Sequence, residues 1–169
     1  MFQSAVVGAL VKKMGTFRYS DQQSEQMLLN SGLKVKWRPQ RKQYVDEILC
    51  LYEGEWSGTV KHGRGKAVEI DGSTFEGYWM HDMKNGFGRL ILANGSVYVG
   101  YWKDNLKEGT GSYFHNDGAR YEGEWKSGQH HGLGKETWED GAVYEGEYRD
   151  GKKHGIGKFS WQDGSTFAG

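Results

Sequence analysis

The sequence predicts an all-β repeat protein: an antiparallel meander or solenoid of β-hairpins that forms one single-layer, twisted sheet. Three observations support this prediction. A pattern recurs every 23 residues without a gap from residue 52 onward, each copy alternates aromatic residues with glycine at a spacing of two, and each copy closes with Asp-Gly or Asn-Gly. The first marks a repeat architecture, the second has the period of a β-strand, and the third is a strong hairpin signal.

Five full copies follow one another before a sixth begins. They span residues 52–74, 75–97, 98–120, 121–143 and 144–166, and the sixth starts at Phe167. Four glycines recur in register in every copy, which explains most of the 27 glycines in the chain. With one hairpin per copy, we expect about ten strands. The chain therefore divides into an N-terminal arm, residues 1–51, and a repeat domain, residues 52–169.

Each copy opens with an aromatic residue, a glycine and a second aromatic residue at alternate positions, so these side chains share one face of a strand. Acids such as Glu122 and Glu124 occupy the positions between, and we expect a solvated opposite face. A single-layer sheet would leave the aromatic face partly open, and open apolar surfaces mark interaction sites. The candidate partner-binding residues are Tyr52, Trp56, Phe75, Trp79, Tyr98, Trp102, Tyr121, Trp125, Tyr144 and Tyr148.

The length of the loop between copies sets the register of the sheet. A two-residue loop pairs Lys135 with Gly146, whereas a three-residue loop with Gly141 in the left-handed conformation pairs Gly134 with Gly146. We expect the longer loop, because it puts the repeat glycines on the aromatic face, where rings lie flat across bare backbone. It also brings Lys135 opposite Glu145, a favourable cross-strand pair.

The repeat Y-x-G-x-W-x-x-G-x-x-H-G-x-G-x-x-x-x-x-D-G resembles the MORN repeat (membrane occupation and recognition nexus). Residues 121–141 match it almost throughout and 52–166 follow it. The resemblance implies a curved or rod-like hairpin solenoid. It also implies scaffolding in cytoskeletal and ciliary assemblies, a place at junctions between membranes, or affinity for acidic phospholipids. The departures, which we place in the connecting turn, are Thr59, Asp82 and Asn105 at the eighth position and Asn85 and Glu108 at the eleventh.

The N-terminal arm is basic, with eight Lys or Arg against four Asp or Glu, whereas the repeats carry 14 against 18. Such an arm either folds back on the acidic array or binds a separate acidic partner. Ser20 and Gln23 resemble a capping box and predict a short helix over 21–30. The first 20 residues hold three bases and no acid, and loosely resemble an organellar targeting segment. Their apolar residues, at near-helical spacing, are Phe2, Val6, Val7, Leu10 and Met14.

Residues 33–38 alternate apolar and basic side chains, which predicts a strand that ends at Pro39. We expect this strand to cover an exposed sheet edge, either that of the first repeat or that of a partner. At the other end of the sheet, the edge formed by the last repeat also needs a cover, from further chain or from another molecule. The candidate contacts to an acidic protein surface or anionic lipid are Lys34, Lys36, Trp37, Arg38, Arg41 and Lys42.

The polar residues do not form a recognisable catalytic or metal site. His62, His131 and His154 share one repeat position, and successive copies lie about 10 Å apart, too far for ligands of one zinc ion. The glutamates of the second repeat position are equivalent and exposed, unlike a general acid–base pair. No phosphate-binding glycine loop follows a strand and opens a helix. The sequence predicts no enzyme, no metal and no cofactor.

We therefore expect a non-catalytic scaffold that joins other proteins in a large assembly, with a ciliary, axonemal or cytoskeletal setting on family resemblance. The arm would be the anchor and the aromatic face the docking surface. The alternatives are a peripheral module that binds anionic phospholipid and an accessory subunit of an organellar, mitochondrial complex. The single Cys50 indicates a reducing, intracellular compartment, no apolar run is long enough to span a membrane, and an acidic array disfavours nucleic acid.

Overall fold

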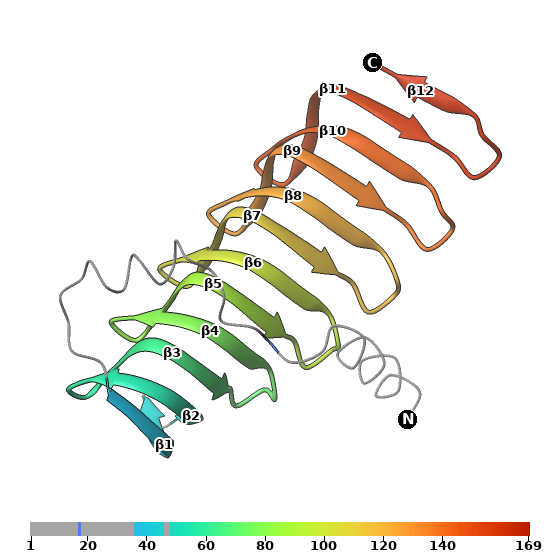
Figure 1. Ribbon diagram of the computed structural model, residues 1–169. Coiled ribbons are helices and arrows are strands. Elements are labelled where there is room, and N and C mark those ends of the chain that lie inside the picture. Colours follow the sequence, from blue (N-terminus) through green and yellow to red (C-terminus); the bar gives the residue numbers. More distant parts are fainter. Residues whose placement is uncertain (1–16, 18–35, 46–47) are drawn as a thin grey trace.

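The computed structural model describes residues 17, 36–45 and 48–169 (Figure 1). These residues form one open antiparallel sheet in which strands adjacent in sequence are adjacent in space. The predicted fold class is confirmed. The strands are β1 (Lys36–Val45), β2 (Ile48–Ser57), β3 (Val60–Val68), β4 (Thr74–Met80), β5 (Met83–Ile91), β6 (Val97–Lys103), β7 (Leu106–Phe114), β8 (Arg120–Lys126), β9 (Gln129–Thr137), β10 (Val143–Arg149), β11 (Lys152–Ser160) and β12 (Thr166–Ala168).

The five full repeats supply the ten strands β2 to β11, as expected from one hairpin per copy. The other two described strands lie at the two edges: β1 comes from the arm and β12 from the start of the sixth copy. The helix expected over 21–30 lies outside the described residues. Within the described part of the chain, no helix has the length and apolarity needed to cross a bilayer.

The loops between repeats have the three-residue form. Trp138 N–H donates to the Ala142 carbonyl at 2.9 Å, which closes a loop of residues 139–141, and Gly141 has φ 85°. Gly146 consequently pairs with Gly134. Glycine is needed at this position because L side chains are strained in the left-handed region. The predicted charge pair forms, with Lys135 Nζ 2.5 Å from a Glu145 carboxylate oxygen.

The turns inside repeats 2 to 5 are two-residue turns in which both residues have positive φ, whereas in repeat 1 Gly58 has positive φ and Thr59 does not. In repeat 3 these residues are Asp104 and Asn105, with φ 48° and 69°. This is the type I′ geometry that suits the twist of a hairpin, and Asn and Asp tolerate it better than most residues. The eighth-position departures therefore lie in the turn, as expected. The eleventh position does not: His62 and Asn85 lie within β3 and β5.

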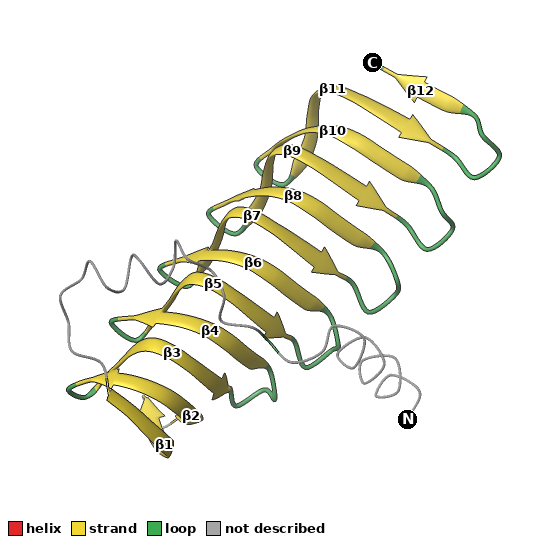
Figure 2. Ribbon diagram, in the orientation of Figure 1, coloured by secondary structure: helices red, strands yellow, loops and turns green. Residues whose placement is uncertain are grey.

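A bulge inside each hairpin was not foreseen from the sequence. In repeat 4, Gly123 pairs with Gly134, but the next residue, Glu124, pairs with His131. Gly132 and Leu133 therefore have no opposite residue on β8, and Gly132 has φ 57°. The Glu124 carboxylate accepts the Leu133 N–H at 3.0 Å and so satisfies a donor that the bulge leaves unpaired. Bulges bend strands, and Figure 2 shows the strands bent along their length.

The arm contributes β1, which pairs antiparallel with β2 and covers the edge of the chain's own first repeat. The expectation that Pro39 ends this strand is wrong, because β1 continues to Val45. The register shifts between Arg38 and Arg41, so Pro39 lies at an irregularity. Proline has no N–H to donate, and within sheets it is tolerated at edges and bulges.

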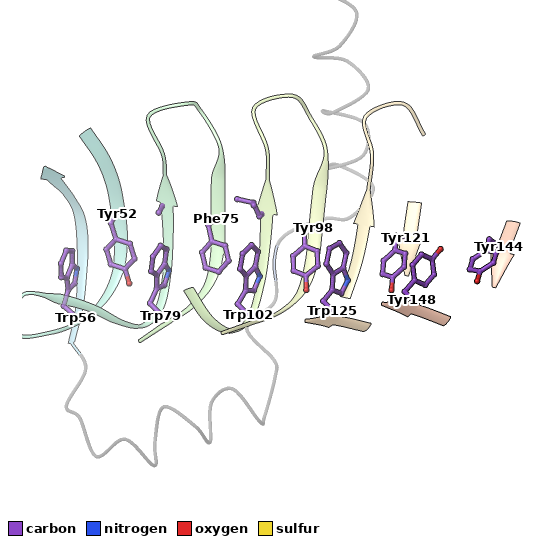
Figure 3. Packing of buried hydrophobic residues seen from close by; sticks show 12 residues of the cluster. Tyr52, Trp56, Phe75, Trp79, Tyr98, Trp102, Tyr121, Trp125, Tyr144 and Tyr148 are labelled. Atoms are coloured by element: carbon purple, nitrogen blue, oxygen red, sulfur yellow. The ribbon is translucent and has the colours of Figure 1, made fainter. Parts of the chain in front are cut away.

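One row of buried aromatic rings, in which the first and second aromatic residues of the copies alternate, forms the core (Figure 3). The first aromatic residue of each copy lies over glycines: a Cβ added at Gly134 would be 2.5 Å from Tyr121 Oη. The second aromatic residue packs edge-on against the rings beside it, with Trp125 centroids 5.2 Å from both Tyr98 and Tyr121. Each copy adds two rings that contact both neighbours, so the core extends along the whole array. No single copy could bury its rings alone.

The opposite, or back, face of the sheet is not uniformly solvated, and that expectation is wrong for the second repeat. The Glu76 side chain is 16% exposed and lies 2.6 Å from Arg89 Nη2, which is itself buried. Burial alone would raise the pKa of Glu76, but hydrogen bonds from Arg89 and Lys66 outweigh it and leave the pKa below its usual value. This carboxylate is a structural ion-pair partner.

Candidate functional site

The ten aromatic residues that the sequence singled out form the floor of the sheet's inner face. Their side chains are 0–8% exposed. They pack against one another and against backbone, so they supply rigidity and leave little ring surface for a partner. These ten residues are here called the floor. The surface of this face that a partner can reach lies around and above the floor.

A column of lysines lies over the floor, at the tenth position of every full repeat except the fourth. Lys107 Nζ lies over three rings, at 5.1 Å from the Tyr98 centroid, 4.4 Å from Tyr113 and 4.7 Å from Trp125. Lys61, Lys84 and Lys153 lie over rings in the same way. Such cation–π contacts contribute about 0.5–2 kcal/mol each, more when water is excluded.

The column is only partly neutralised by carboxylates. Lys84 pairs with Glu69 and Lys153 with Glu136, each with a nitrogen–oxygen distance of 2.5 Å. Within the described part of the chain, neither Lys61 nor Lys107 has an ion pair. Desolvation lowers the pKa of Lys107 to about 8. An acidic group brought to this position would pair with a cation that is already held in place and partly dehydrated.

The fourth repeat replaces the lysine of the column with His130. Its ring stacks on Tyr121 with a centroid distance of 3.6 Å and an interplanar angle of 7°. Burial lowers the pKa of His130 to about 4, against the smaller opposing effect of Glu136. His130 is therefore neutral at pH 7, and the cation column is interrupted at this repeat.

A second row of apolar and aromatic side chains borders the floor, and the sequence analysis missed it. This row, here called the rim, occupies six of the eight sixteenth and eighteenth positions of repeats 2 to 5; the other two hold the buried Leu90 and the charged Glu136. Its rings touch between repeats 4 and 5, where the centroids of Trp138 and Phe159 lie 5.3 Å apart, and within repeat 5, where those of Phe159 and Trp161 lie 4.5 Å apart. The rim residues are Leu92, Tyr113, His115, Trp138, Phe159 and Trp161.

The rim is the accessible apolar surface of this face. Leu92, Tyr113, Trp138 and Phe159 pack on the floor while partly exposed, and Trp161 is 45% exposed. The first repeat has Ala67 and Glu69 at the equivalent positions, so a strict repeat pattern does not reveal the row. The enrichment of aromatics at these positions in the later copies was the available signal.

The histidines of the eleventh position differ in their burial, and His154 is exposed. His62 is fully buried and contacts the ring of His81 at 5.3 Å. Its pKa is lowered, first by burial and then by His81, against the opposing charge of Glu55. The described residues hold no group of three or more His, Cys, Asp or Glu side chains placed to share a metal ion.

The basic residues of the arm lie in or beside β1. Lys34 lies outside the described residues. Lys36, Trp37 and Arg38 pair with Trp56, Glu55 and Gly54 respectively, and Arg41 and Lys42 follow the register shift opposite Tyr52 and Leu51. Five of the six predicted contact residues therefore belong to a paired edge strand.

The comparisons with known proteins agree with this architecture. The profile of the MORN repeat matches residues 52–74, 75–97, 98–120, 121–143 and 144–166, so the chain belongs to the MORN-repeat family. MORN repeats are modules that bind other proteins or membranes. A search of the curated proteins found no match.

Among solved structures, the chain is similar to the TCP domain of SAS-4 (dCPAP) of Drosophila melanogaster, solved in complex with a proline-rich motif of Ana2 (dSTIL). The sequences are 11% identical, the match covers 80% of this chain and 96% of that chain, and the TM-score is 0.36. At this score the likeness carries no argument about function.

Proposed function

We propose that this chain is a non-catalytic scaffold subunit that holds a protein partner along the inner face of its sheet. The partner would lie across the rim, with apolar side chains against Trp138 and Phe159 and an acidic group at Lys107. A ciliary, axonemal or cytoskeletal assembly is the setting that we propose, on the basis of family resemblance.

The observation that carries this proposal is the combination of rim and cation column. Monomeric proteins rarely expose rows of contacting aromatic residues, and such rows mark interaction sites. Here the row rests on a floor that is already rigid, so a partner loses little free energy to ordering this surface. Family membership independently identifies the repeats as an interaction module.

The experiment is proximity labelling and affinity capture from native cells with the full-length chain, compared with two exposed-residue variants. Trp161→Ala alters the rim, and Leu133→Ala, at a position 65% exposed on the back face, is the control. We expect one set of proteins to be retained by the wild type and the control, and to be reduced about tenfold by Trp161→Ala, as for a hot-spot aromatic. Equal capture by all three chains would refute the inner face as the site.

Salt separates the protein-scaffold function from the lipid alternative. A contact through an apolar rim persists at high ionic strength, whereas binding of a basic arm to anionic vesicles is screened. We expect the captured proteins to remain at 0.5 M salt, where the Debye length is about 4 Å instead of about 10 Å at 0.1 M. Loss of every protein, with sedimentation on phosphatidylserine vesicles at low salt alone, would favour lipid binding and refute the scaffold.

A further inference from the structure

The back face of the sheet changes character along the array. At the fourth position of each copy, repeats 4 and 5 have Glu124 and Glu147, whereas repeats 2 and 3 have Tyr78 and Tyr101. Further apolar side chains surround these two tyrosines. This surface on β4 to β7, here called the back patch, consists of Tyr78, Phe87, Ile91, Val97, Val99, Tyr101 and Phe114.

Parts of the back patch are buried to a degree that the sheet does not explain. Tyr78 is 1% exposed and Val97 is fully buried. By contrast, Leu133 and Ile156, which occupy the repeat position of Phe87 in the later copies, are 65% and 74% exposed. A single-layer sheet covers its own back face poorly, so another segment must lie against repeats 2 and 3.

The described residue of the arm that precedes β1 lies on this patch. The Phe17 ring stacks on Phe87 with centroids 5.9 Å apart and an interplanar angle of 17°. The Arg89 guanidinium carbon lies 5.7 Å from the centre of the same ring. Arg89 is fixed by Glu76, which accepts from its Nε and Nη2 at 3.2 and 2.6 Å. Phe17 therefore contacts both a fixed cation and an aromatic ring of β5.

We propose that residues 1–16, directly before Phe17, dock on the back patch of the same molecule, with Phe17 as the anchor. One phenylalanine side chain buries about 150–250 Å². This area is enough to cover the back face of β5, but it does not also cover Tyr78 on β4 and Val97 on β6. The preceding residues supply the missing apolar surface at near-helical spacing: Phe2, Val6, Val7, Leu10 and Met14.

The length of the chain permits docking within one molecule. Strand β5 lies four strand spacings from β1, or about 19 Å. Residues 18–35 span up to about 60 Å when extended, so Phe17 reaches β5 without strain. A tether of this length gives an effective concentration in the millimolar range, which favours the chain's own arm over that of a second copy.

Charge supports the same occupant. The first 20 residues carry Lys12, Lys13 and Arg18 and no acid, whereas the repeats have four more acids than bases. Glu124 is exposed on the back face beside the patch. Its carboxylate would attract the three basic residues of the arm. Docking would remove the apolar stripe of the arm from solvent. The stripe would then be explained by its role in the folded chain, and not by a function in organellar import.

The test uses photocrosslinking of the full-length chain. Tyr101→p-benzoylphenylalanine places the probe in the back patch, and Leu133→p-benzoylphenylalanine places it on the same face in repeat 4. We expect crosslinks of monomer mass from position 101 to residues 1–16, and none above background from position 133. No excess at position 101 would refute the proposal, and crosslinks of dimer mass would assign the patch to a second copy and also refute it.

Variants of the arm decide whether the apolar stripe is responsible. Leu10→Asp, in the chain with the position 101 probe, should reduce the crosslink yield about tenfold, equivalent to about 1.4 kcal/mol of docking free energy. Gln3→Asp adds the same charge at a polar position and should leave the yield unchanged. Deuterium uptake at β5 and β6 should rise with Leu10→Asp in the chain without a probe. Unchanged yield and uptake would overturn the assignment.

Discussion

The contact between each first aromatic ring and the glycines beneath it can be tested with a double-mutant cycle in repeat 4. A Cβ at Gly134 would lie 2.5, 2.6 and 2.7 Å from Oη, Cε2 and Cζ of Tyr121. Real Cβ atoms do not approach other atoms so closely, so the ring must leave its place. We expect Gly134→Ala to destabilise the protein by about 2–3 kcal/mol, within the range for overpacked cores.

The cycle separates this clash from other effects of the added methyl group. Tyr121→Ala should cost about 3–5 kcal/mol, as for other large buried aromatics. In the double variant the methyl group meets no ring, and alanine restricts the unfolded chain more than glycine by about 0.4–1 kcal/mol. The double variant should therefore be no less stable than Tyr121→Ala alone, which gives a coupling of about 2–4 kcal/mol.

Gly123 provides the matched control. A Cβ there would lie 2.6 Å from Gly134 Cα and 2.6 Å from the Leu133 carbonyl oxygen, which are backbone atoms, and 2.7 Å from Tyr121 Oη. Removal of the Tyr121 ring relieves only the last of these contacts, so Tyr121→Ala should rescue Gly123→Ala much less than it rescues Gly134→Ala. The assay is urea unfolding followed by tryptophan fluorescence and far-UV circular dichroism. Additive losses for Gly134→Ala and Tyr121→Ala would refute the ring-over-glycine explanation.

Three further perturbations address the bulge, the buried imidazole and the loop. Glu124→Ala should cost about 1 kcal/mol in urea unfolding, because the Leu133 N–H loses its acceptor, and Glu124→Gln, which keeps an oxygen, should cost less; equal losses would contradict this role. His130 has a folded-state pKa of about 4, below the 6.5 of an unperturbed histidine, so the unfolded chain binds more protons between these values and stability should fall as pH drops from 6.5 to 4. His130→Gln should lose less stability over that range than the wild type, and parallel pH profiles would exclude His130 as the cause. Asp140→Ala removes the acceptor of the Ala142 N–H and should lower the free energy of unfolding by about 0.5–1.5 kcal/mol, with Glu139→Ala as a neutral control.

The sequence determined the repeat and its register. The ungapped spacing of 23 residues and the alternation of aromatic residues with glycine fixed the strands and the face that each side chain occupies. Because side chains alternate with a period of two, the length of the loop alone decides which residues of neighbouring strands pair. The glycine pattern indicated the three-residue loop, and Gly134 lies opposite Gly146 as predicted.

The bulge could not be predicted, because it depends on a contact between strands. Gly132 looks like one more glycine in the pattern, and its positive φ shows only in three dimensions. Residues that depart from the strict repeat pattern were not predicted as part of the accessible surface, for a related reason. Tyr113 and Trp138 follow the repeat loosely, so the rim was missed although it is the accessible apolar surface of the inner face.

Burial was decided by the tertiary structure alone. The sequence placed Tyr121 and Trp125 on one face but could not show that neighbouring rings would close over them and leave 0% and 5% of their surface exposed. It likewise treated the residues equivalent to Glu76 as one solvated column. The sheet twists and bends as a unit, and Phe17, more than 50 residues earlier in the chain than Phe87 and Arg89, lies against one part of it. A repeat pattern fixes what each copy shares, whereas burial depends on what lies beside each copy.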